Sequence, residues 1–490
     1  MLFRSLASND SHGRLLDDPA SASAGAAAMA GAVKGLRADN PNTTFVMAGD
    51  IVGASTFESF IQNDKPTLDA MNEAGLEVSA AGNHEFDQGY SDLMNRIMKS
   101  YDATGNKTGG ADWPYIAANV RLGDADGGYA LDPSLIGGTG RTDGNFAHSN
   151  GATWWKEFPT LDGGNGIKVG FVGAVTEDLD SLVAPSSING LAITGIVDEV
   201  NEAAAGLKAT GCGGEACDLV VELVHEGAPA PSCDTIAGDA DSVFGRIVHG
   251  ASTDVDAIIS GHTHLKYNCK VPVAGKALDR PVVSAGQYGS YLNQLEFDFA
   301  PGTNDLVDIR QHVLAMKDYD DDTATKAIVT DAVQVATTLG ARELGQVAGP
   351  FKRARRSDPT SGIVENRGGE STLGNLVAEM QREETGADIG VMNPGGLRDD
   401  LVGTDDGPGP VTYREAANVQ PFANTLVTVD LTGAQVKTLL EQQWQRDPDG
   451  NVPSRPFLRL GTSNGFTWTE DSSRDEGDRI TGMWLDGERS

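Results

Sequence analysis

Short apolar runs alternate with helix-like segments over residues 1–315. The runs Phe45–Ala48 and Leu219–Val224 have the length and composition of buried strands. The segments Ser21–Leu36 and Pro66–Ala74 have the apolar spacing of amphipathic helices. Alternation of strands with helices favours α/β architecture. We therefore expect an α/β domain over this part of the chain.

A different pattern begins near residue 345 and continues to the end of the sequence. Thr372–Glu384 and Gly433–Trp444 have helical spacing. Thr425–Leu431 alternates as a strand, and Arg479–Gly487 has the pattern of a strand followed by a turn. These elements indicate a second domain over residues 345–490.

The segment between these two regions, Ala315–Thr338, also has helical spacing, and Gly340 is a typical helix end. Its place between two compositionally complete regions favours a linker helix within residues 316–344. An ordinary helix of one of the two domains is the alternative interpretation.

Side chains that bind metals follow several of the buried runs. Five of the eight histidines of the chain lie in these places. Polar groups on Gly-rich turns after strands are where α/β folds put their chemistry. A single Asp or His there would be an ordinary turn or core residue, but five such segments together predict one metal site. The segments are Asn9–Gly13, Gly49–Gly53, Gly82–Glu85, Val224–Glu226 and Gly261–His264.

The side chains of these segments form a mixed set of nitrogen and oxygen donors without a thiolate. Carboxylates and imidazoles in this number suit two divalent metal ions of the Zn, Mn, Co, Fe or Ni class. Two such ions about 3.5–4 Å apart stabilise both oxygens of a phosphoryl displacement, so we expect a metal-dependent hydrolase. The predicted metal ligands are Asp10, His12, Asp50, Asn83, His225, His262 and His264.

His84 has a different predicted role from the other histidines of these segments. It follows the predicted ligand Asn83 and precedes Asp87 by three residues. A histidine oriented by a carboxylate can donate a proton to a leaving oxygen, so we expect His84 and Asp87 to be catalytic. The alternative is that His84 is itself a metal ligand. Glu85 is expected to have a structural role.

The charge of the chain limits its partners. The 37 basic and 70 acidic side chains give a formal net charge of −33 at pH 7. This argues against binding of nucleic-acid duplexes or anionic membranes, which need a basic surface; a solubility adaptation is the simplest interpretation of the charge. No stretch approaches the roughly 20 apolar residues of a membrane span. Met1–Arg4 leads almost directly into the first metal segment, so no signal peptide is recognised.

The four cysteines are Cys212, Cys217, Cys233 and Cys269. Their even number and loop-rich surroundings favour two disulfides, and pairing Cys212 with Cys217 and Cys233 with Cys269 is one of three arrangements. A zinc knuckle fits the spacings poorly, and free thiols are the other alternative. Disulfides are typical of proteins outside the cytoplasm, so we expect a secreted, periplasmic or cell-surface location.

The metal segments, in this order, resemble the calcineurin-like metallophosphatases, whose pattern is D-x-H, G-D, G-N-H-E, a lone H and G-H-x-H. The motifs Glu370–Leu376, Asn393–Arg398 and Gln420–Asn424 narrow the likeness to bifunctional 5′-nucleotidases and UDP-sugar hydrolases. The resemblance implies a metallophosphoesterase β-sandwich flanked by helices. It also implies a linker helix and a smaller α+β C-terminal domain that binds the substrate.

The resemblance implies roles for individual residues as well. One ion would be held by Asp10, His12 and His264. The other would be held by Asn83, His225 and His262, and Asp50 would bridge the two. The C-terminal domain would bind the nucleotide, with arginine forks for its phosphate and an aromatic ring and an amide for its base. These substrate-binding residues are Arg367, Arg398, Phe422 and Asn424.

The reaction implied is hydrolysis of nucleoside 5′-monophosphates to nucleoside and phosphate, with nucleoside di- and triphosphates or UDP-sugars as further substrates. A 2′,3′-cyclic-nucleotide phosphodiesterase/3′-nucleotidase on the same scaffold is the alternative. A non-catalytic nucleotide-binding surface protein is a more distant one. The family pattern continues beyond Ser490 with a second base-stacking aromatic ring, so the C-terminal domain is expected to be incomplete.

Overall fold

The computed structural model describes residues 1–19, 22–123, 129–130, 141–160, 166–358, 362–404, 407–421, 424–446 and 456–489. The chain forms two compact units, Met1–Ala336 and Thr337–Ser490. The division falls inside helix α9 (Thr323–Gly340).

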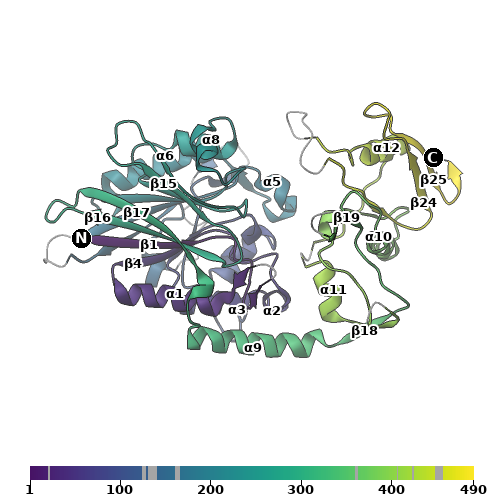
Figure 1. Ribbon diagram of the computed structural model, residues 1–490, viewed down its shortest axis with the longest axis horizontal. Helices are drawn as coiled ribbons and strands as arrows, with labels where there is room; N and C mark the ends of the chain where they lie inside the picture. Colours follow the sequence, from purple (N-terminus) through teal and green to yellow (C-terminus); the bar gives the residue numbers. More distant parts are fainter. Residues whose placement is uncertain are drawn as a thin grey trace. The chain divides into compact units, whose positions relative to one another are not determined.

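Two six-stranded sheets form the centre of the N-terminal unit (Figure 1). Their strand orders are β17-β16-β1-β4-β5-β6 and β14-β15-β13-β12-β10-β9. The four strands β1, β4, β5 and β6 are parallel, and so are β10, β12, β13 and β15. The first sheet consists of β1 (Leu2–Ser8), β4 (Thr43–Ala48), β5 (Val78–Ala80), β6 (Tyr115–Ile116), β16 (Tyr291–Phe299) and β17 (Leu306–Ala315). The second consists of β9 (Thr153–Phe158), β10 (Ile167–Val175), β12 (Leu219–His225), β13 (Ala257–Ser260), β14 (Lys266–Val271) and β15 (Arg280–Ala285).

The two sheets share an apolar core. Phe3 of β1, Val46 of β4 and Val221 of β12 belong to it. Because neighbouring side chains of a strand point to opposite faces, Val220 and Val224 of β12 belong instead to a cluster with helices on the other side of the sheet. Strands buried on both faces consist of nearly continuous apolar residues, and this is why β4 and β12 are recognisable in the sequence.

Helices cover the outer face of each sheet (Figure 1). Met29 of α1 and Leu68 of α3 pack with Phe45 of β4 on the first sheet. Val200 of α6 and Ile247 of α8 pack on the second. The predicted β-sandwich flanked by helices is therefore confirmed. The principal helices are α1 (Gly25–Asp39), α2 (Phe57–Phe60), α3 (Lys65–Ala74), α6 (Ile196–Gly206) and α8 (Val243–Gly250).

Two disulfides crosslink the second sheet and its flanking segments. Cys212 is bonded to Cys217, and Cys233 at the start of α7 (Cys233–Gly238) is bonded to Cys269 of β14. The two predicted disulfides are confirmed, and the structure has this one of the three possible pairings. The alternatives of a zinc knuckle and free thiols are excluded for these cysteines.

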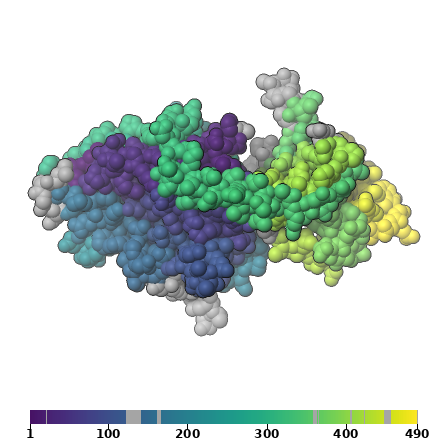
Figure 2. Space-filling model, turned by 90° about the horizontal axis from the view of Figure 1, so that it is seen from below, coloured from purple at the N-terminus to yellow at the C-terminus, as the bar shows by residue number. Residues whose placement is uncertain are grey.

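Helix α9 begins eight residues later than the start of the helical pattern at Ala315, because β17 continues to that residue. Val329 and Ala332 are buried in the core of the N-terminal unit. The helix lies at the surface in Figure 2, and Val335 is 41% exposed. Within the described residues, no helix has the length and apolar character needed to cross a bilayer.

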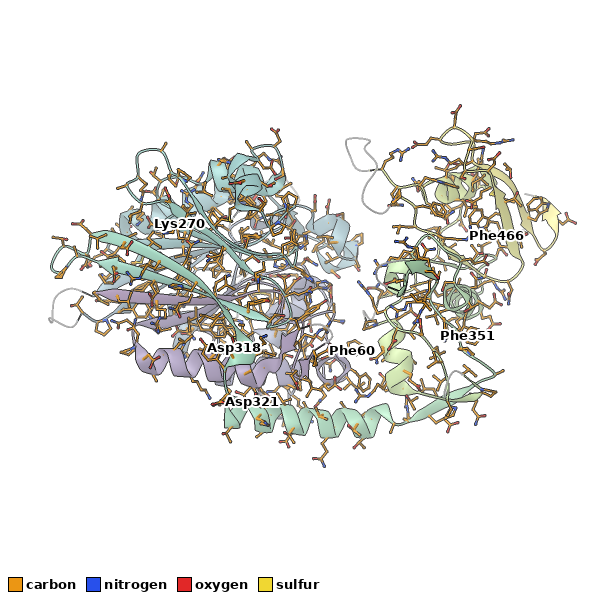
Figure 3. The ribbon with its side chains drawn as sticks, in the orientation of Figure 1. Phe60, Lys270, Asp318, Asp321, Phe351 and Phe466 are labelled. Carbon is orange, nitrogen blue, oxygen red and sulfur yellow. A yellow bond between two sulfur atoms is a disulfide. The ribbon has the colours of Figure 1, made fainter. Side chains whose placement is uncertain are left out.

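The C-terminal unit is a smaller α+β body with two apolar clusters. Leu373 and Val377 of α10 form one cluster, against which Phe351 packs; Phe466 and Ile480 belong to the other (Figure 3). Its helices are α10 (Thr372–Thr385), α11 (Tyr413–Val419) and α12 (Gly433–Glu441). Its strands are β18 (Glu343–Val347), β19 (Arg355–Asp358), β20 (Gly362–Glu365), β21 (Val391–Met392), β22 (Gly409–Thr412), β23 (Gly461–Thr462), β24 (Phe466–Glu470), β25 (Ile480–Leu485) and β26 (Glu488–Arg489).

The strand predicted at Thr425–Leu431 is wrong. The segment has no strand assignment, and Val427 and Val429 are 77% and 70% exposed. A strand requires a hydrogen-bonding neighbour as well as an alternating sequence, and no described strand pairs with this segment.

Candidate metal centre

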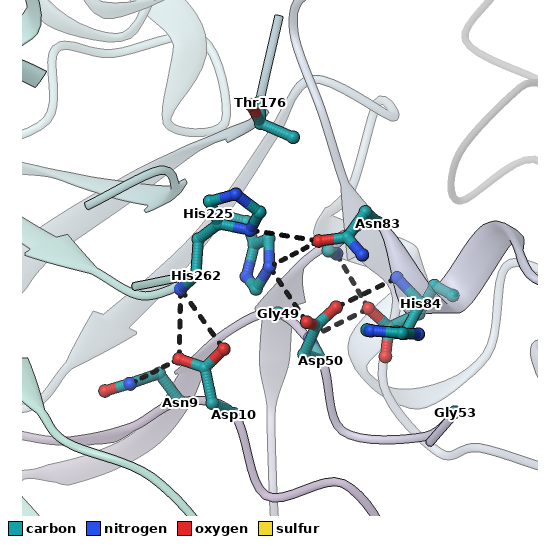
Figure 4. Close-up of polar contacts among 12 residues, drawn as sticks. Asn9, Asp10, Gly49, Asp50, Gly53, Asn83, His84, Thr176, His225 and His262 are labelled. Carbon is teal, nitrogen blue, oxygen red and sulfur yellow. Dashed lines mark hydrogen bonds and ion pairs between the residues drawn. The ribbon is translucent and has the colours of Figure 1, made fainter. Parts of the chain in front are cut away.

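The five metal segments converge where parallel strands of both sheets end (Figure 4). Asp10 follows β1, Asp50 follows β4 and Asn83 follows β5. His225 is the last residue of β12, and His262 follows β13 by one residue. Parallel strands place their carboxyl ends at one edge of a sheet, so segments far apart in the sequence contribute to one cluster.

Asp10, His12 and His264 form one group of donors. Oδ1 of Asp10 lies 3.3 Å from Nε2 of His264 and 3.9 Å from Nε2 of His12. The two Nε2 atoms are 3.2 Å apart. One donor atom from each residue thus lies within 4.8 Å of the other two, which is a spacing that a single ion can bridge.

Asp50 lies between this group and a second one. Its Oδ2 is 3.6 Å from Nε2 of His12 and 3.1 Å from Nε2 of His225. Oδ1 of Asn83 lies 3.2 Å from Nε2 of His225 and 3.0 Å from Nδ1 of His262. The structure therefore brings all seven predicted ligands together, and Asp50 contacts a histidine of each group. Figure 4 shows Asp10, Asp50, Asn83, His225 and His262.

Backbone carbonyls orient two of the imidazoles. Nδ1 of His12 lies 2.9 Å from the carbonyl oxygen of Gly53, and Nδ1 of His225 lies 2.8 Å from that of Ala48. A carbonyl only accepts hydrogen bonds, so each neutral ring carries its proton on Nδ1 and directs the lone pair of Nε2 into the cluster. This is the usual arrangement of a metal-bound histidine and its supporting hydrogen bond.

Five of the seven predicted ligands have a strained backbone conformation. Non-glycine residues with positive φ are uncommon and persist only where the surrounding structure imposes them. The φ angles here are 49° at Asp10, 46° at His12, 52° at Asp50, 70° at His262 and 62° at His264. Such a concentration is typical of a functional site.

The electrostatics of the cluster favour bound cations. Burial lowers the pKa of His12 to about 4, so this ring is neutral. Burial would also lower the pKa of His225, but the negative charge of Asp50 outweighs it and raises the pKa to about 10. The field that favours a proton on the Nε2 of His225 favours a metal ion at the same place. The site therefore combines buried carboxylates with imidazole nitrogens whose lone pairs point into the cluster, and the Nε2 atoms of His12 and His264 lie in contact. Such a set of donors suits divalent metal ions.

His84 lies beside the cluster. Its Nδ1 is 2.8 Å from Oδ2 of Asp87, and its backbone N–H donates to Oδ1 of Asp50 at 3.0 Å. Burial would lower the pKa of His84, but the charge of Asp50 and the hydrogen bond to Asp87 outweigh it and raise the pKa to about 9. The ring also lies within 4.8 Å of donors on His12 and Asp50, so the geometry is compatible with either predicted role.

Two polar residues that sequence reasoning gave no role are next to ligands in the chain, and one of them, Asn9, hydrogen-bonds to a ligand. Nδ2 of Asn9 donates to Oδ2 of Asp10 at 2.6 Å, and its Oδ1 accepts from the backbone N–H of Ala285. Glu226, the residue after His225, accepts a hydrogen bond from the hydroxyl of Thr176 at 2.7 Å. Their only signal in the sequence is adjacency to a ligand, which does not show where a side chain points.

The C-terminal unit holds the predicted substrate-binding residues. Nε of Arg367 donates to Glu365 at 2.9 Å, and a Cβ on Gly395 would lie 3.7 Å from its Nη1. The backbone N–H of Arg398 donates to Val419. Asn424 lines a cavity of about 910 Å³ that the turn Asn393–Gly396 also lines. Phe422 lies outside the described residues.

Residues 345–489 match the family described as the 5′-nucleotidase, C-terminal domain. The chain is 24% identical over 445 residues to endonuclease YhcR of Bacillus subtilis, covering 90% of this chain and 31% of that protein. It is 26% identical over 458 residues to the cell wall protein Lmo0130 of Listeria monocytogenes (89% and 53% covered). It is also 26% identical over 459 residues to a 5′-nucleotidase of Vibrio vulnificus (88% and 73% covered). The chain thus spans about a third to a half of the length of the first two relatives.

Solved structures share the fold. The 5′-nucleotidase precursor from Thermus thermophilus has a TM-score of 0.62 at 21% identity, with 100% of this chain and 87% of that chain covered. A putative 5′-nucleotidase from Staphylococcus aureus, in complex with alpha-ketoglutarate, has a TM-score of 0.67 at 17% identity, with the same coverage. The predicted resemblance and fold class are confirmed: the chain has the fold of solved 5′-nucleotidase structures, and its residues 345–489 match the 5′-nucleotidase C-terminal domain.

Proposed function

We propose that this chain, whose residues 345–489 belong to the 5′-nucleotidase C-terminal domain family, hydrolyses nucleoside 5′-monophosphates to nucleoside and phosphate. The observation that carries the proposal is the largely buried set of seven metal donors with the His84–Asp87 pair beside it. A protein that only binds nucleotides has no need of that pair.

The donor set divides into two ion sites. Asp10, His12 and His264 would hold one ion, and Asn83, His225 and His262 the other. Asp50, between the groups, would serve both. When bound, two divalent ions supply positive charge that activates water and neutralises the phosphoryl oxygens.

His84 supplies the proton in this proposal. Its Nδ1 is engaged by Asp87, which leaves Nε2 for the substrate. The carboxylate fixes the ring and favours its protonated form, so Nε2–H donates to a phosphoryl oxygen or to the leaving oxygen. A side chain about one quarter exposed can reach a substrate.

The C-terminal unit supplies the nucleotide-binding groups. Arg367 and Arg398 offer the planar donor forks that bind phosphate in pairs of hydrogen bonds. Asn424 offers both a donor and an acceptor for the edge of a base. Phe422 is assigned to base stacking by its place in the motif Gln420–Asn424. These assignments are supported by the position of Arg367 beside the turn that carries Arg398.

We also propose that the protein works outside the cytoplasm. Two disulfides support this, because such bonds persist in oxidising compartments. The similarity to a protein named for the bacterial cell wall supports it as well.

Chromatographic analysis of the products, together with phosphate release, on a panel of substrates tests the function. AMP, 2′,3′-cyclic AMP and UDP-glucose are compared before and after removal of metal by a chelator, with Zn²⁺, Mn²⁺ or Co²⁺ added back. We expect AMP to be cleaved, the activity to vanish on chelation and one of the metals to restore it. Preferential cleavage of 2′,3′-cyclic AMP would show that the protein is the alternative, a 2′,3′-cyclic-nucleotide phosphodiesterase. Absence of turnover on every substrate with metal bound would contradict an enzymatic role.

A further inference from the structure

Arg14 is a half-buried arginine beside the metal centre, and none of the described residues gives it an acidic partner. In the described part of the chain no carboxylate lies within 4.0 Å of its guanidinium, although the protein has 70 acidic side chains. Other arginines of the unit either pair with carboxylates, as Arg4 does with Glu296, or donate to several backbone carbonyls, as Arg280 does. The contacts of the Arg14 side chain are the ring of Tyr288, 4.2 Å from Cζ to the ring centroid, and the carbonyl of His12 at 3.5 Å.

The ring of Tyr288 packs against the guanidinium of Arg14 and against two metal ligands. Its ring centroid lies 5.9 Å from that of His12 and 5.6 Å from that of His264, in edge-on contacts. The same aromatic ring thus contacts both the guanidinium and the imidazole of His264. Cation–π contact holds an arginine in place without using its hydrogen-bond donors.

The backbone of Tyr288 shows that the position of its ring is imposed by the fold. The residue has a φ of 59°, a conformation that is strained for a bulky side chain. Its N–H donates to the carbonyl oxygen of the ligand Asp10 at 2.7 Å, which fixes the strained turn directly behind the metal site. Strain of this kind clusters at ligand-binding sites.

We infer that Arg14, braced by Tyr288, is a specificity-determining residue that binds a second phosphate linked to the one being cleaved. The inference rests on the proposed function. An uncommitted guanidinium presents a fork of N–H donors that matches phosphate oxygens. Since the whole chain is strongly acidic, a cation left unpaired at this position offsets the repulsion that a second phosphate would meet. Arg14 would therefore favour substrates with two linked phosphates over monophosphates.

The test compares AMP and ADP in wild type, Arg14→Ala and Arg14→Lys. Loss of charged hydrogen bonds should lower kcat/KM for ADP by about 10- to 100-fold and leave that for AMP within about threefold. Arg14→Lys should have a kcat/KM for ADP between those of Arg14→Ala and wild type, because an ammonium group lacks the planar pair of N–H donors of a guanidinium. Arg310→Ala, on the strand β17, is the matched control and should change neither substrate.

Two further variants separate binding from folding. Tyr288→Phe should behave as wild type, since the ring remains, whereas Tyr288→Ala should reproduce the ADP-selective loss. Calorimetric affinities of ADP and AMP for His84→Asn, with and without Arg14→Ala, measure the same preference without turnover. Equal losses for AMP and ADP, or no loss for either, would overturn the inference while leaving the function intact. Wild type that cleaves neither nucleotide would instead contradict the proposed function.

Discussion

The carboxylate of Glu85 accepts a hydrogen bond from the backbone N–H of Asp50, with Oε2 at 2.9 Å. It also accepts hydrogen bonds from the backbone N–H groups of Ile51 at 2.8 Å and Gly82 at 2.7 Å. Glu85 is 1% exposed. One buried carboxylate therefore ties the loop that carries Asp50 to the loop that carries Asn83, so the distance between two proposed ligands depends on a side chain that is not a ligand.

Replacing Glu85 by Gln should weaken metal binding. The amide keeps one acceptor oxygen and places an NH₂ group against backbone N–H donors, which repels one of the two loops. Loss of such a supporting group typically lowers metal affinity by about 10- to 100-fold. Competition with a chelator, followed by metal analysis, measures the affinity. Glu215→Gln, at an exposed ion pair with Lys168, is the control. An unchanged affinity in folded Glu85→Gln would show that the loops hold their positions without it.

Replacing His84 by Asn should remove turnover and keep the metal. Loss of a general acid lowers kcat by about 10²- to 10⁴-fold, whereas the seven proposed ligands are untouched. Asp87→Asn should cost less, because the ring remains and loses only its orienting charge. The measurements are kcat on AMP and the metal content of each purified variant. Loss of one metal ion per chain in His84→Asn would instead make His84 a ligand.

The sequence predicts this site well because its ligands follow strands that are buried on both faces. Runs such as Thr43–Ala48 are apolar throughout and are recognisable without a partner. The residue after such a run lies at a sheet edge whatever the details of the loop. The position of Asp50 is therefore predictable from local sequence, even though its contact with His225 joins segments more than 170 residues apart.

The parts that sequence could not predict depend on what a side chain meets. The carbonyl of Ala48 that orients His225 is separated from it by 177 residues. The turn at Tyr288 has no distinctive composition, because its strain is imposed by a hydrogen bond to Asp10. The alternation in Thr425–Leu431 is typical of a strand, but pairing is a property of two segments and cannot be read from one.

The two disulfides should contribute unequally to stability. Cys233 and Cys269 are 36 residues apart, whereas Cys212 and Cys217 are five apart. In the chain-entropy account the longer loop contributes about 4 kcal/mol and the shorter about 2 kcal/mol. Paired Cys→Ser variants, unfolded in denaturant at fixed metal concentration, measure each effect. A larger loss from the Cys212–Cys217 pair would show that local packing, and not loop closure, dominates.

Glu222 is a buried carboxyl in the middle of β12. It is 1% exposed, and in the described part of the chain neither oxygen has a hydrogen-bond partner. Burial raises its pKa to about 8, although the nearby charge of Arg280 acts in the opposite direction. An unfolded glutamate has a pKa near 4.3. Between these two values the folded protein keeps the proton that the unfolded chain releases, so the stability due to this group is full at low pH and is lost as pH rises through about 8.

Replacing Glu222 by Gln should remove the loss of stability at high pH, because the amide has the same shape as the carboxyl group and does not ionise. The difference in unfolding free energy between the variant and wild type should be small at pH 4.5 and should grow to the order of a few kcal/mol near pH 8.5. Both proteins share the same metal site, so subtracting their pH profiles cancels the pH dependence of metal binding. Glu215→Gln should give no such growth, since its side chain is exposed. A difference that stays constant from pH 4.5 to 8.5 would show that Glu222 is ionised in the folded protein and finds compensation from Arg280.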